Sequence, residues 1–252
     1  MKYLTSVDGR VCDLSELRSD LPYVMQRIHT LHGRAYNVEH HLALLCEASA
    51  ELLGFTPLVD ADKVRAAVAE LLDMAHAPTR FSVPVAMRLN SRGEHILIVE
   101  RPTFGAGAYL RAKRVDVAPV VCHTQFDEWE SSASVAYDAL LDHRSYARGG
   151  ERAIPVSEAG YVLSRPWLLT LVVAGNTVYS PSEHHSVEYA VARRAVEAAG
   201  MHFVVRPIPL ALLDRADEIL FIDIMGIIAA TKIGDHRLSF SAAIRLAQQM
   251  QP

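Results

Sequence analysis

One polar group ahead of a predicted helix could perform acid–base chemistry. His123, Glu128 and Glu130 lie within eight positions of each other, and an imidazole beside a carboxylate is suited to general acid–base catalysis. A polar loop has the same composition, so that explanation stays open. Cys122 beside His123 could form a nucleophilic pair, but neighbouring residues on a strand point to opposite faces of the sheet.

Two further groups could bind a ligand. His184-His185 and Glu188 resemble a metal-ligand cluster, because His185 and Glu188 would share a helix face. No third ligand is evident, so we predict a capped helix start here and no metal site. Arg88 could hold a substrate carboxylate through its planar guanidinium, and a surface or inter-strand arginine is the alternative.

Composition narrows the class of protein. The 252 residues include 25 basic and 29 acidic side chains, mixed along the chain, with no basic stripe for nucleic acid. No apolar run approaches the roughly 20 residues that a membrane span needs, and the N-terminus lacks the apolar core of a signal peptide. The cysteines are Cys12, Cys46 and Cys122, with no metal or disulfide spacing. We therefore expect a cytoplasmic protein without nucleic-acid or membrane partners.

Periodic apolar residues predict the elements that must position these groups. The predicted helices are Val38–Leu53, Asp62–His76, Ser131–Ala147, Val187–Ala199, Pro209–Arg215 and Ser239–Gln249. Phe81–Leu89 and His95–Glu100 are predicted to pair as strands, and Tyr109–Val121 is predicted to contain a strand pair. Asp8-Gly9 and His32-Gly33 predict turns.

The stretch from Glu151 to Pro181 predicts a run of short strands. Its apolar segments are Ala153–Val156, Tyr161–Leu163, Leu168–Val173 and Val178-Tyr179. Turn signals at Gly160 and Gly175-Asn176 separate them. We interpret this pattern as a meander in an antiparallel or mixed sheet.

This stretch resembles the central segment of the fold-type-IV pyridoxal-phosphate (PLP) enzymes. They comprise the class IV aminotransferases, including branched-chain and D-amino-acid aminotransferases, and 4-amino-4-deoxychorismate lyase. Their pattern, roughly "deALLLDxxGyVlExxxsNlFlvxxgxlyTP", is followed without a gap. His41–Leu45, Met87–Gly93 and Ala216–Asp223 resemble further family segments.

The resemblance covers about residues 30 to 249 and implies a two-domain α+β fold like that of D-amino-acid aminotransferase. An N-terminal α/β sandwich would span 1–101, and a barrel-like α+β domain would span 109–252. Residues 102–108 would link the two domains. The family assembles its site near a homodimer interface, so a homodimer is implied as well.

The residues that carry the family's chemistry are replaced here. The lysine that forms the Schiff base falls on Ser131, and the glutamate that contacts the pyridine nitrogen falls on Ser164. The arginine that binds phosphate falls on Leu44, which offers no donor. The phosphate-binding turn falls on Ser186–Tyr189, where Glu188 would repel phosphate, and the family's last phosphate hydroxyl would fall near Asp223–Met225.

Only four lysines are present, namely Lys2, Lys63, Lys113 and Lys232, and Lys232 is the one considered as a replacement for the family lysine. By motif position, the family's pocket between the domains would be lined by Ser131, Ser164, Arg165, Glu188 and Asp223, with Arg88 from the N-terminal sheet.

Three functions remain open. The first is a protein that has lost PLP chemistry and uses the family's pocket for another small molecule, as an enzyme or as a binding protein. The second is a PLP-dependent aminotransferase or lyase with a rearranged site. The third is a non-catalytic pseudoenzyme that binds a partner protein.

Overall fold

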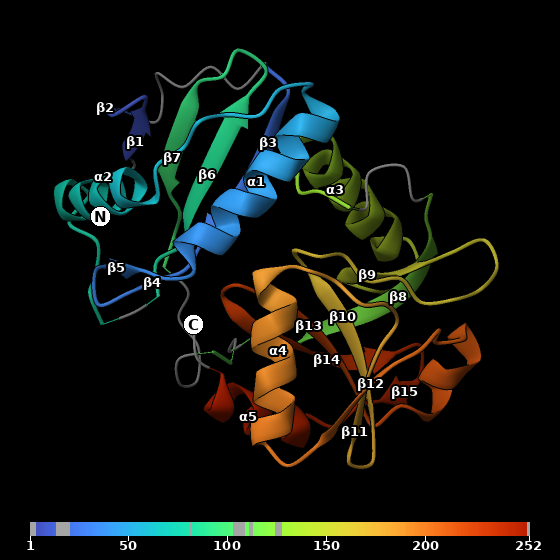
Figure 1. The fold of residues 1–252 in the computed structure, drawn as a ribbon. Helices are drawn as coiled ribbons and strands as arrows, with labels where there is room; N and C mark the ends of the chain where they lie inside the picture. The colour runs from blue at the N-terminus through green and yellow to red at the C-terminus, as the bar shows by residue number, and fades with distance from the viewer. Residues whose placement is uncertain are drawn as a thin grey trace. The chain divides into compact units, whose positions relative to one another are not determined.

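The computed structural model describes residues 4–13, 21–80, 82–102, 109–110, 113–123 and 128–250 (Figure 1). They form two compact units. The first contains the described residues up to 102 together with Trp129–Ala133, and the second contains the other described residues. Residues 103–108 of the predicted linker and residues 124–127 lie outside the described residues.

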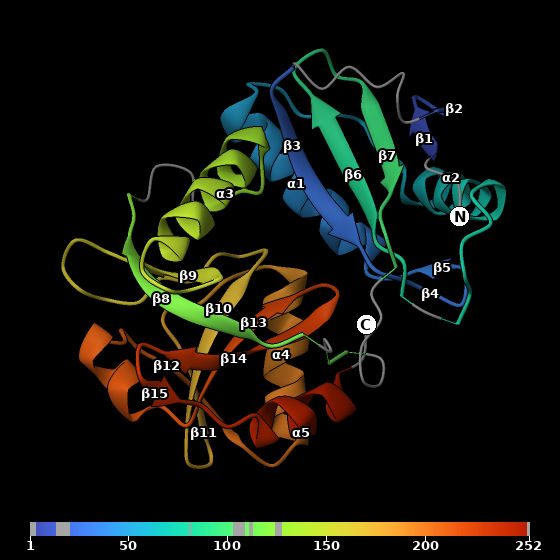
Figure 2. The ribbon, with the colours of Figure 1, turned by 180° about the vertical axis from the view of Figure 1, so that it is seen from behind.

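The first unit is built on a five-stranded antiparallel sheet, seen from behind in Figure 2, with strand order β2-β1-β7-β6-β3. Its strands are β1 (Leu4–Val7), β2 (Arg10–Asp13), β3 (Tyr23–Ile28), β6 (Val85–Asn90) and β7 (His95–Val99). A separate two-stranded ribbon pairs β4 (Thr30–Leu31) with β5 (Arg34–Ala35). The strands predicted at Phe81–Leu89 and His95–Glu100 correspond to β6 and β7, and their predicted pairing is confirmed.

Two helices cover one face of this sheet. These are α1 (Val38–Leu52) and α2 (Ala61–Met74). The Asp60 carboxylate caps α2 by accepting the amide of Asp62 at 2.9 Å. Their apolar stripes enclose one core with the inward side chains of the sheet, including Val68, Leu71 and Met87. Side chains alternate along a strand, so Met25 and Arg88, which are register partners, point to the opposite face.

Both predicted tight turns are present. Asp8-Gly9 and His32-Gly33 each join two antiparallel strands, and all four residues have positive φ, from 47° to 84°. Two central residues with positive φ are the signature of the type I′ turn, whose twist matches that of paired strands.

The second unit is built on an eight-stranded mixed sheet, with order β12-β11-β10-β13-β14-β8-β9 and β15 beside β14. Its strands are β8 (Val115–Val121), β9 (Arg152–Val156), β10 (Leu169–Ala174), β11 (Thr177–Ser180), β12 (His202–Val205), β13 (Glu218–Asp223), β14 (Gly226–Ile233) and β15 (His236–Arg237). The predicted strand pair at 109–121 is therefore wrong, because within its described residues only β8 forms, with an isolated bridge at Leu110.

The predicted meander is only partly correct. β10 and β11 form the expected hairpin, but β9 lies beside β8, in parallel, at the far end of the sheet. The reason is that β8 and β9 are joined through α3 (Ser132–Tyr146), and parallel neighbours need such a crossover. The predicted strand Tyr161–Leu163 forms only isolated bridges, to Val156 and Pro209. The first bridge reaches the end of β9, and the second reaches a residue four positions after the end of β12.

The remaining helices are α4 (Val187–Ala198), α5 (Ser241–Gln249) and the 3-10 helix η2 (Leu210–Arg215). The buried Glu218 caps α5, because its carboxylate accepts the amides of Ala242 and Ala243 at 2.7 and 2.9 Å. This carboxylate joins the end of the chain to the start of β13.

Gly226 marks a close approach of two segments at the start of β14. Its φ is 115°, and a Cβ atom there would lie 2.1 Å from the carbonyl oxygen of Tyr109. Only glycine allows the backbone of Tyr109 to accept the Ile227 amide at 2.7 Å.

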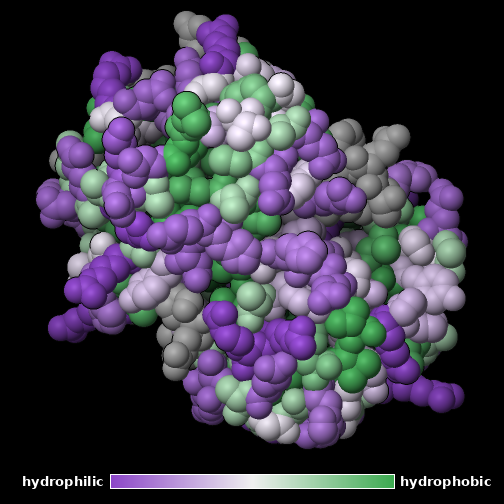
Figure 3. All heavy atoms as spheres, viewed as in Figure 1, coloured by the Kyte–Doolittle hydropathy of each residue, from purple (hydrophilic) through white to green (hydrophobic). Residues whose placement is uncertain are grey.

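No helix among the described residues combines the length and the apolar character needed to cross a bilayer. Hydrophilic residues cover most of the face shown in Figure 3, and hydrophobic residues are scattered among them.

One buried imidazole makes stability depend on pH. His41 in α1 is fully buried, and its Nδ1 lies 3.0 Å from Oε1 of Gln26. Burial, together with the charges of His40 and His29, lowers the pKa of His41 to about 3. The folded protein therefore holds this ring neutral, whereas the unfolded chain protonates it below about pH 6.5.

We predict that the neutral His41 ring makes the free energy of unfolding depend on pH. The free energy of unfolding should be highest above about pH 6.5 and should fall by at most about 1.4 kcal/mol per pH unit as pH falls toward 3. Urea denaturation of wild type and His41→Gln between pH 7 and pH 4 measures the difference in slope. His41→Gln should take up about one proton fewer on unfolding, so its free energy of unfolding should depend less steeply on pH. The exposed-site control His40→Gln should keep the wild-type slope. Equal slopes for wild type and His41→Gln would contradict this assignment.

Candidate functional site

An ion pair with a buried guanidinium joins Arg165 to Asp138 in the second unit. Arg165 is 2 % exposed, and its Nε lies 2.9 Å from Oδ1 of Asp138 on α3. The guanidinium carbon also lies 5.6 Å from the ring centroids of both Tyr137 and Trp167. Trp167 donates its indole N–H to the other oxygen of Asp138, at 3.2 Å. A buried guanidinium needs such a carboxylate and such aromatic faces to offset its desolvation.

Ser164 closes the turn that carries this arginine. Its hydroxyl oxygen accepts the Thr170 amide at 3.0 Å, and both residues are buried. Arg165 and Leu168 bridge inside the same turn. Ser164 therefore stabilises the entry to β10, and its side chain brings no negative charge.

The N-terminus of α4 carries its own cap and its own anion. The Ser186 hydroxyl accepts the Tyr189 amide at 3.2 Å and donates to the Pro166 carbonyl at 2.6 Å. Glu188 is 5 % exposed in the first helical turn. A helix N-terminus attracts anions, and Glu188 is the acidic residue of this first turn.

The residues just before α4 form the predicted capped helix start, with Ser186 as the cap. Because the helix begins at Val187, His185 precedes it and does not share a helical face with Glu188. His184 lies 3.0 Å from the Ser182 hydroxyl, and burial followed by the charge of His185 lowers its pKa to about 4. Among the described residues, no group of three or more His, Cys, Asp or Glu could hold a metal ion.

Asp223 lies at the same end of the second sheet as Arg165. Strand register pairs Leu169 with Ile222, which places Asp223 beside the start of β10. Its carboxylate accepts the Met225 amide at 2.8 Å and closes the turn into β14. Four predicted pocket residues therefore occupy one end of this unit, namely Ser164, Arg165, Glu188 and Asp223.

A small polar cavity adjoins this end of the sheet. Its volume is about 30 Å³, and its lining includes two carboxylates and two guanidinium groups. The charged lining residues are Asp138, Asp142, Arg152 and Arg165. A water molecule occupies about 30 Å³ of liquid, so this cavity within the second unit accommodates water rather than an aromatic ring.

The two other predicted pocket residues belong to the first unit. Arg88 on β6 places its guanidinium 4.4 Å from the ring centroid of Tyr23, and its buried Nε has no hydrogen-bond partner among the described residues. Ser131 bridges Val24 at the edge of β3, next to Glu130, whose carboxylate pairs with Arg27. Leu44 is a buried apolar residue of α1.

The predicted acid–base group does not assemble as a unit. The imidazole of His123 is exposed and lies 3.3 Å from the carboxylate of Glu158. Glu130 instead pairs with Arg27 of β3, and Glu128 is exposed. Cys122 and His123 follow the end of β8, and Cys122 is buried while His123 is exposed.

None of the described lysines lies at this end of the second sheet. Lys232 is 44 % exposed and lies 3.5 Å from Asp116. It lies six positions along β14 from Gly226, and at about 3.3 Å per position this part of the strand spans about 20 Å. Lys113 pairs with Glu151 at 2.7 Å, and Lys63 lies in the first turn of α2.

Sequence reasoning did not find Asp138, although this residue partners Arg165. The two lie 27 positions apart, and no local pattern links them. The one available signal was the pair Asp138 and Asp142, which are four residues apart on a predicted helix and flank the buried Leu141. Such a pair marks a helix face that needs polar partners.

No protein-family model matches this chain, and no curated protein matches it either. Solved structures do match over almost the whole length. The fold IV transaminase from Curtobacterium pusillum shares 18% identity over 96% of each chain, with a TM-score of 0.77. The branched-chain aminotransferase from Thermoproteus uzoniensis shares 18% identity over 98% of this chain and 93% of that one, with a TM-score of 0.75.

A hypothetical aminotransferase from Mycobacterium tuberculosis, in its PLP-bound form, gives a TM-score of 0.77 at 18% identity, over 98% of this chain and 97% of that one. These matches confirm the predicted α+β architecture. The chain therefore has the fold of the fold-type-IV PLP aminotransferases.

Proposed function

We propose that this protein has lost PLP chemistry and binds another small molecule, one that carries a carboxylate. The observation that carries this proposal is the N-terminus of α4. There, the resemblance places a phosphate-binding turn, and this chain has the buried carboxylate of Glu188 and the cap of Ser186. A phosphate dianion next to a buried carboxylate would be repelled.

Further residues support the proposal. A lysine, an arginine and a glutamate of the family would stand at Ser131, Leu44 and Ser164. None of these three can form a Schiff base, bind phosphate with a guanidinium, or present a carboxylate to a pyridine nitrogen. Lys232 is the candidate to replace the family's Schiff-base lysine, and it lies about 20 Å along β14 from the turn that contains Asp223. These residues do not fit PLP, so we assign no reaction step to it.

The ligand class follows from Arg88. This guanidinium stacks on Tyr23 and has no carboxylate partner among the described residues. A planar guanidinium binds a carboxylate through two parallel hydrogen bonds. We therefore assign Arg88 as the carboxylate anchor.

The resemblance also implies a homodimer. We expect light scattering to give twice the chain mass of 27.8 kDa.

We predict that PLP does not stabilise the protein. A ligand at 100 times its dissociation constant stabilises a protein by about 2.7 kcal/mol, which raises the melting temperature of a 250-residue chain by several degrees. With 1 mM PLP we expect a shift below about 1 °C, equal to that with inorganic phosphate. Glu188→Gln should bind phosphate more tightly than wild type does. A PLP-specific rise of several degrees would contradict the proposal.

We also predict that small carboxylates bind at Arg88. Butyrate, glutarate and benzoate should shift amide resonances of β3 and β6 in an NMR titration, and neutral butyramide should not. Arg88→Met should abolish this binding, because a bidentate charged hydrogen bond is lost. The matched control Arg92→Met removes the same charge from the exposed turn that follows β6. Equal binding to wild type and Arg88→Met would contradict the assignment.

A further inference from the structure

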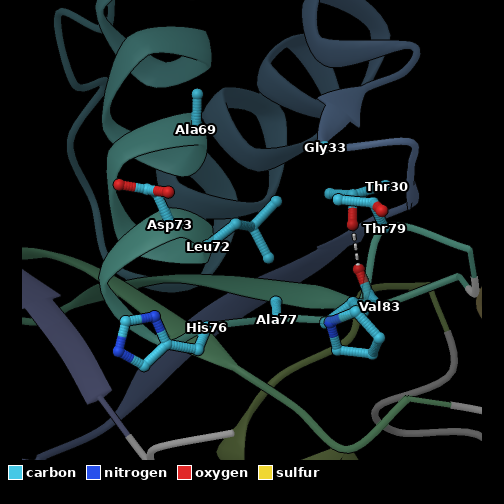
Figure 4. A pocket seen from close by; sticks show the side chains of 10 residues that line it. Thr30, Gly33, Ala69, Leu72, Asp73, His76, Ala77, Thr79 and Val83 are labelled. Atoms are coloured by element: carbon cyan, nitrogen blue, oxygen red, sulfur yellow. Dashed lines mark hydrogen bonds between the residues drawn. The ribbon is translucent and has the colours of Figure 1, made fainter.

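The first unit contains a second cavity that is independent of the proposed function. Its volume is about 180 Å³, and it lies between the end of α2, the β4–β5 ribbon, residues 76–79 and Val83 (Figure 4). At about 30 Å³ for each molecule, this space corresponds to roughly six waters. It is therefore large enough for a small organic molecule and smaller than the 300–1,000 Å³ usual for drug-sized ligands.

The lining combines an apolar floor with polar walls. Figure 4 shows Asp73 and His76 on one side and Thr30 and Thr79 on the other, with Leu72 between them. The hydroxyl of Thr30 donates to the Val83 carbonyl, which leaves its oxygen lone pairs as acceptors. The cavity thus offers a short apolar surface bordered by hydroxyl, imidazole and carboxylate groups.

The electrostatics of this cavity favour a cation. Asp73 lies in the last turn of α2, at the negative end of the helix dipole, and that turn contains no basic residue. The residues that line the cavity include no lysine and no arginine. The carboxylate of Asp73 forms no ion pair with the described residues.

The backbone around the cavity is held in an unusual conformation. Four non-glycine residues among those described have positive φ; one of them, His76 at 51°, lines this cavity, and His32, at 54°, precedes the lining residue Gly33. His32 donates its amide to the Thr79 carbonyl at 3.1 Å, which joins the ribbon to the opposite wall. Both conformations have a local cause, because His32 lies in the type I′ turn and His76 follows the C-terminus of α2.

We propose that this cavity is a binding site for a small organic cation. Its ligand carries a primary ammonium group, which Asp73 binds with the hydroxyl oxygens of Thr30 or Thr79 as further acceptors. A short apolar chain of the ligand packs on Leu72 and Ala77. This site lies entirely in the first unit and needs no residue of the proposed carboxylate site.

An NMR titration of the full-length protein with n-butylammonium chloride tests the proposal. The amide resonances of Gly33 and Ala77 should shift and saturate at millimolar ligand, while sodium butyrate and 1-butanol should leave them unchanged. Asp73→Asn should weaken binding about three- to fivefold, the range of an exposed ion pair. Ala69→Leu should abolish binding, because leucine fills the cavity from α2.

The matched control is Glu70→Gln, which removes the same charge from an exposed neighbour on α2 that does not line the cavity. It should leave the dissociation constant unchanged. If Glu70→Gln and Asp73→Asn weaken n-butylammonium binding equally, the loss reflects only the net charge of the protein. That result would overturn the proposal. Shifts of equal size with butyrate or butanol, or undiminished binding to Ala69→Leu, would overturn it as well.

Discussion

The ion pair between Arg165 and Asp138 determines the arrangement of the second unit's polar residues. A guanidinium that is 2 % exposed must keep a carboxylate partner, because leaving one buried charge alone costs about 3–5 kcal/mol. Holding Arg165 inward fixes the turn between β9 and β10. That turn brings Ser164 to the Thr170 amide and the Pro166 carbonyl to the Ser186 hydroxyl. One buried charge thus connects α3, the start of β10 and the start of α4.

This constraint also bears on chemistry. Three polar groups at this end of the sheet are held by internal contacts, namely the Ser186 cap, the Asp223 turn and the ion pair of Arg165 with Asp138. Groups committed to internal hydrogen bonds are poorly placed to bind a cofactor, because each bond must break first. Arg88, in the first unit, has a different character, since it stacks on Tyr23 and has no carboxylate partner among the described residues. Our proposal therefore assigns ligand binding to Arg88.

Much of the fold could be predicted because its signals are local. The apolar stripe and Asp60 cap of α2, and the turn at Asp8-Gly9, involve residues within a few positions of each other. The neighbour of β9 could not be predicted, because α3 carries the chain across before β9 forms. The same limit applies to the site: the types of Ser164 and Glu188 were evident, but the partnership of Arg165 with Asp138 joins residues 27 positions apart.

The absorbance spectrum of the purified protein with added PLP tests directly whether the protein has lost PLP chemistry. Borohydride reduction and peptide mass mapping then identify any lysine that PLP has modified. We predict a spectrum equal to that of free PLP and no specifically modified lysine. Lys232→Arg serves as a control for incidental reaction at that exposed amine, which lies 3.5 Å from Asp116. A stable internal-aldimine band, with pyridoxyl mass on a single lysine, would contradict the account and identify the residue that replaces the family lysine.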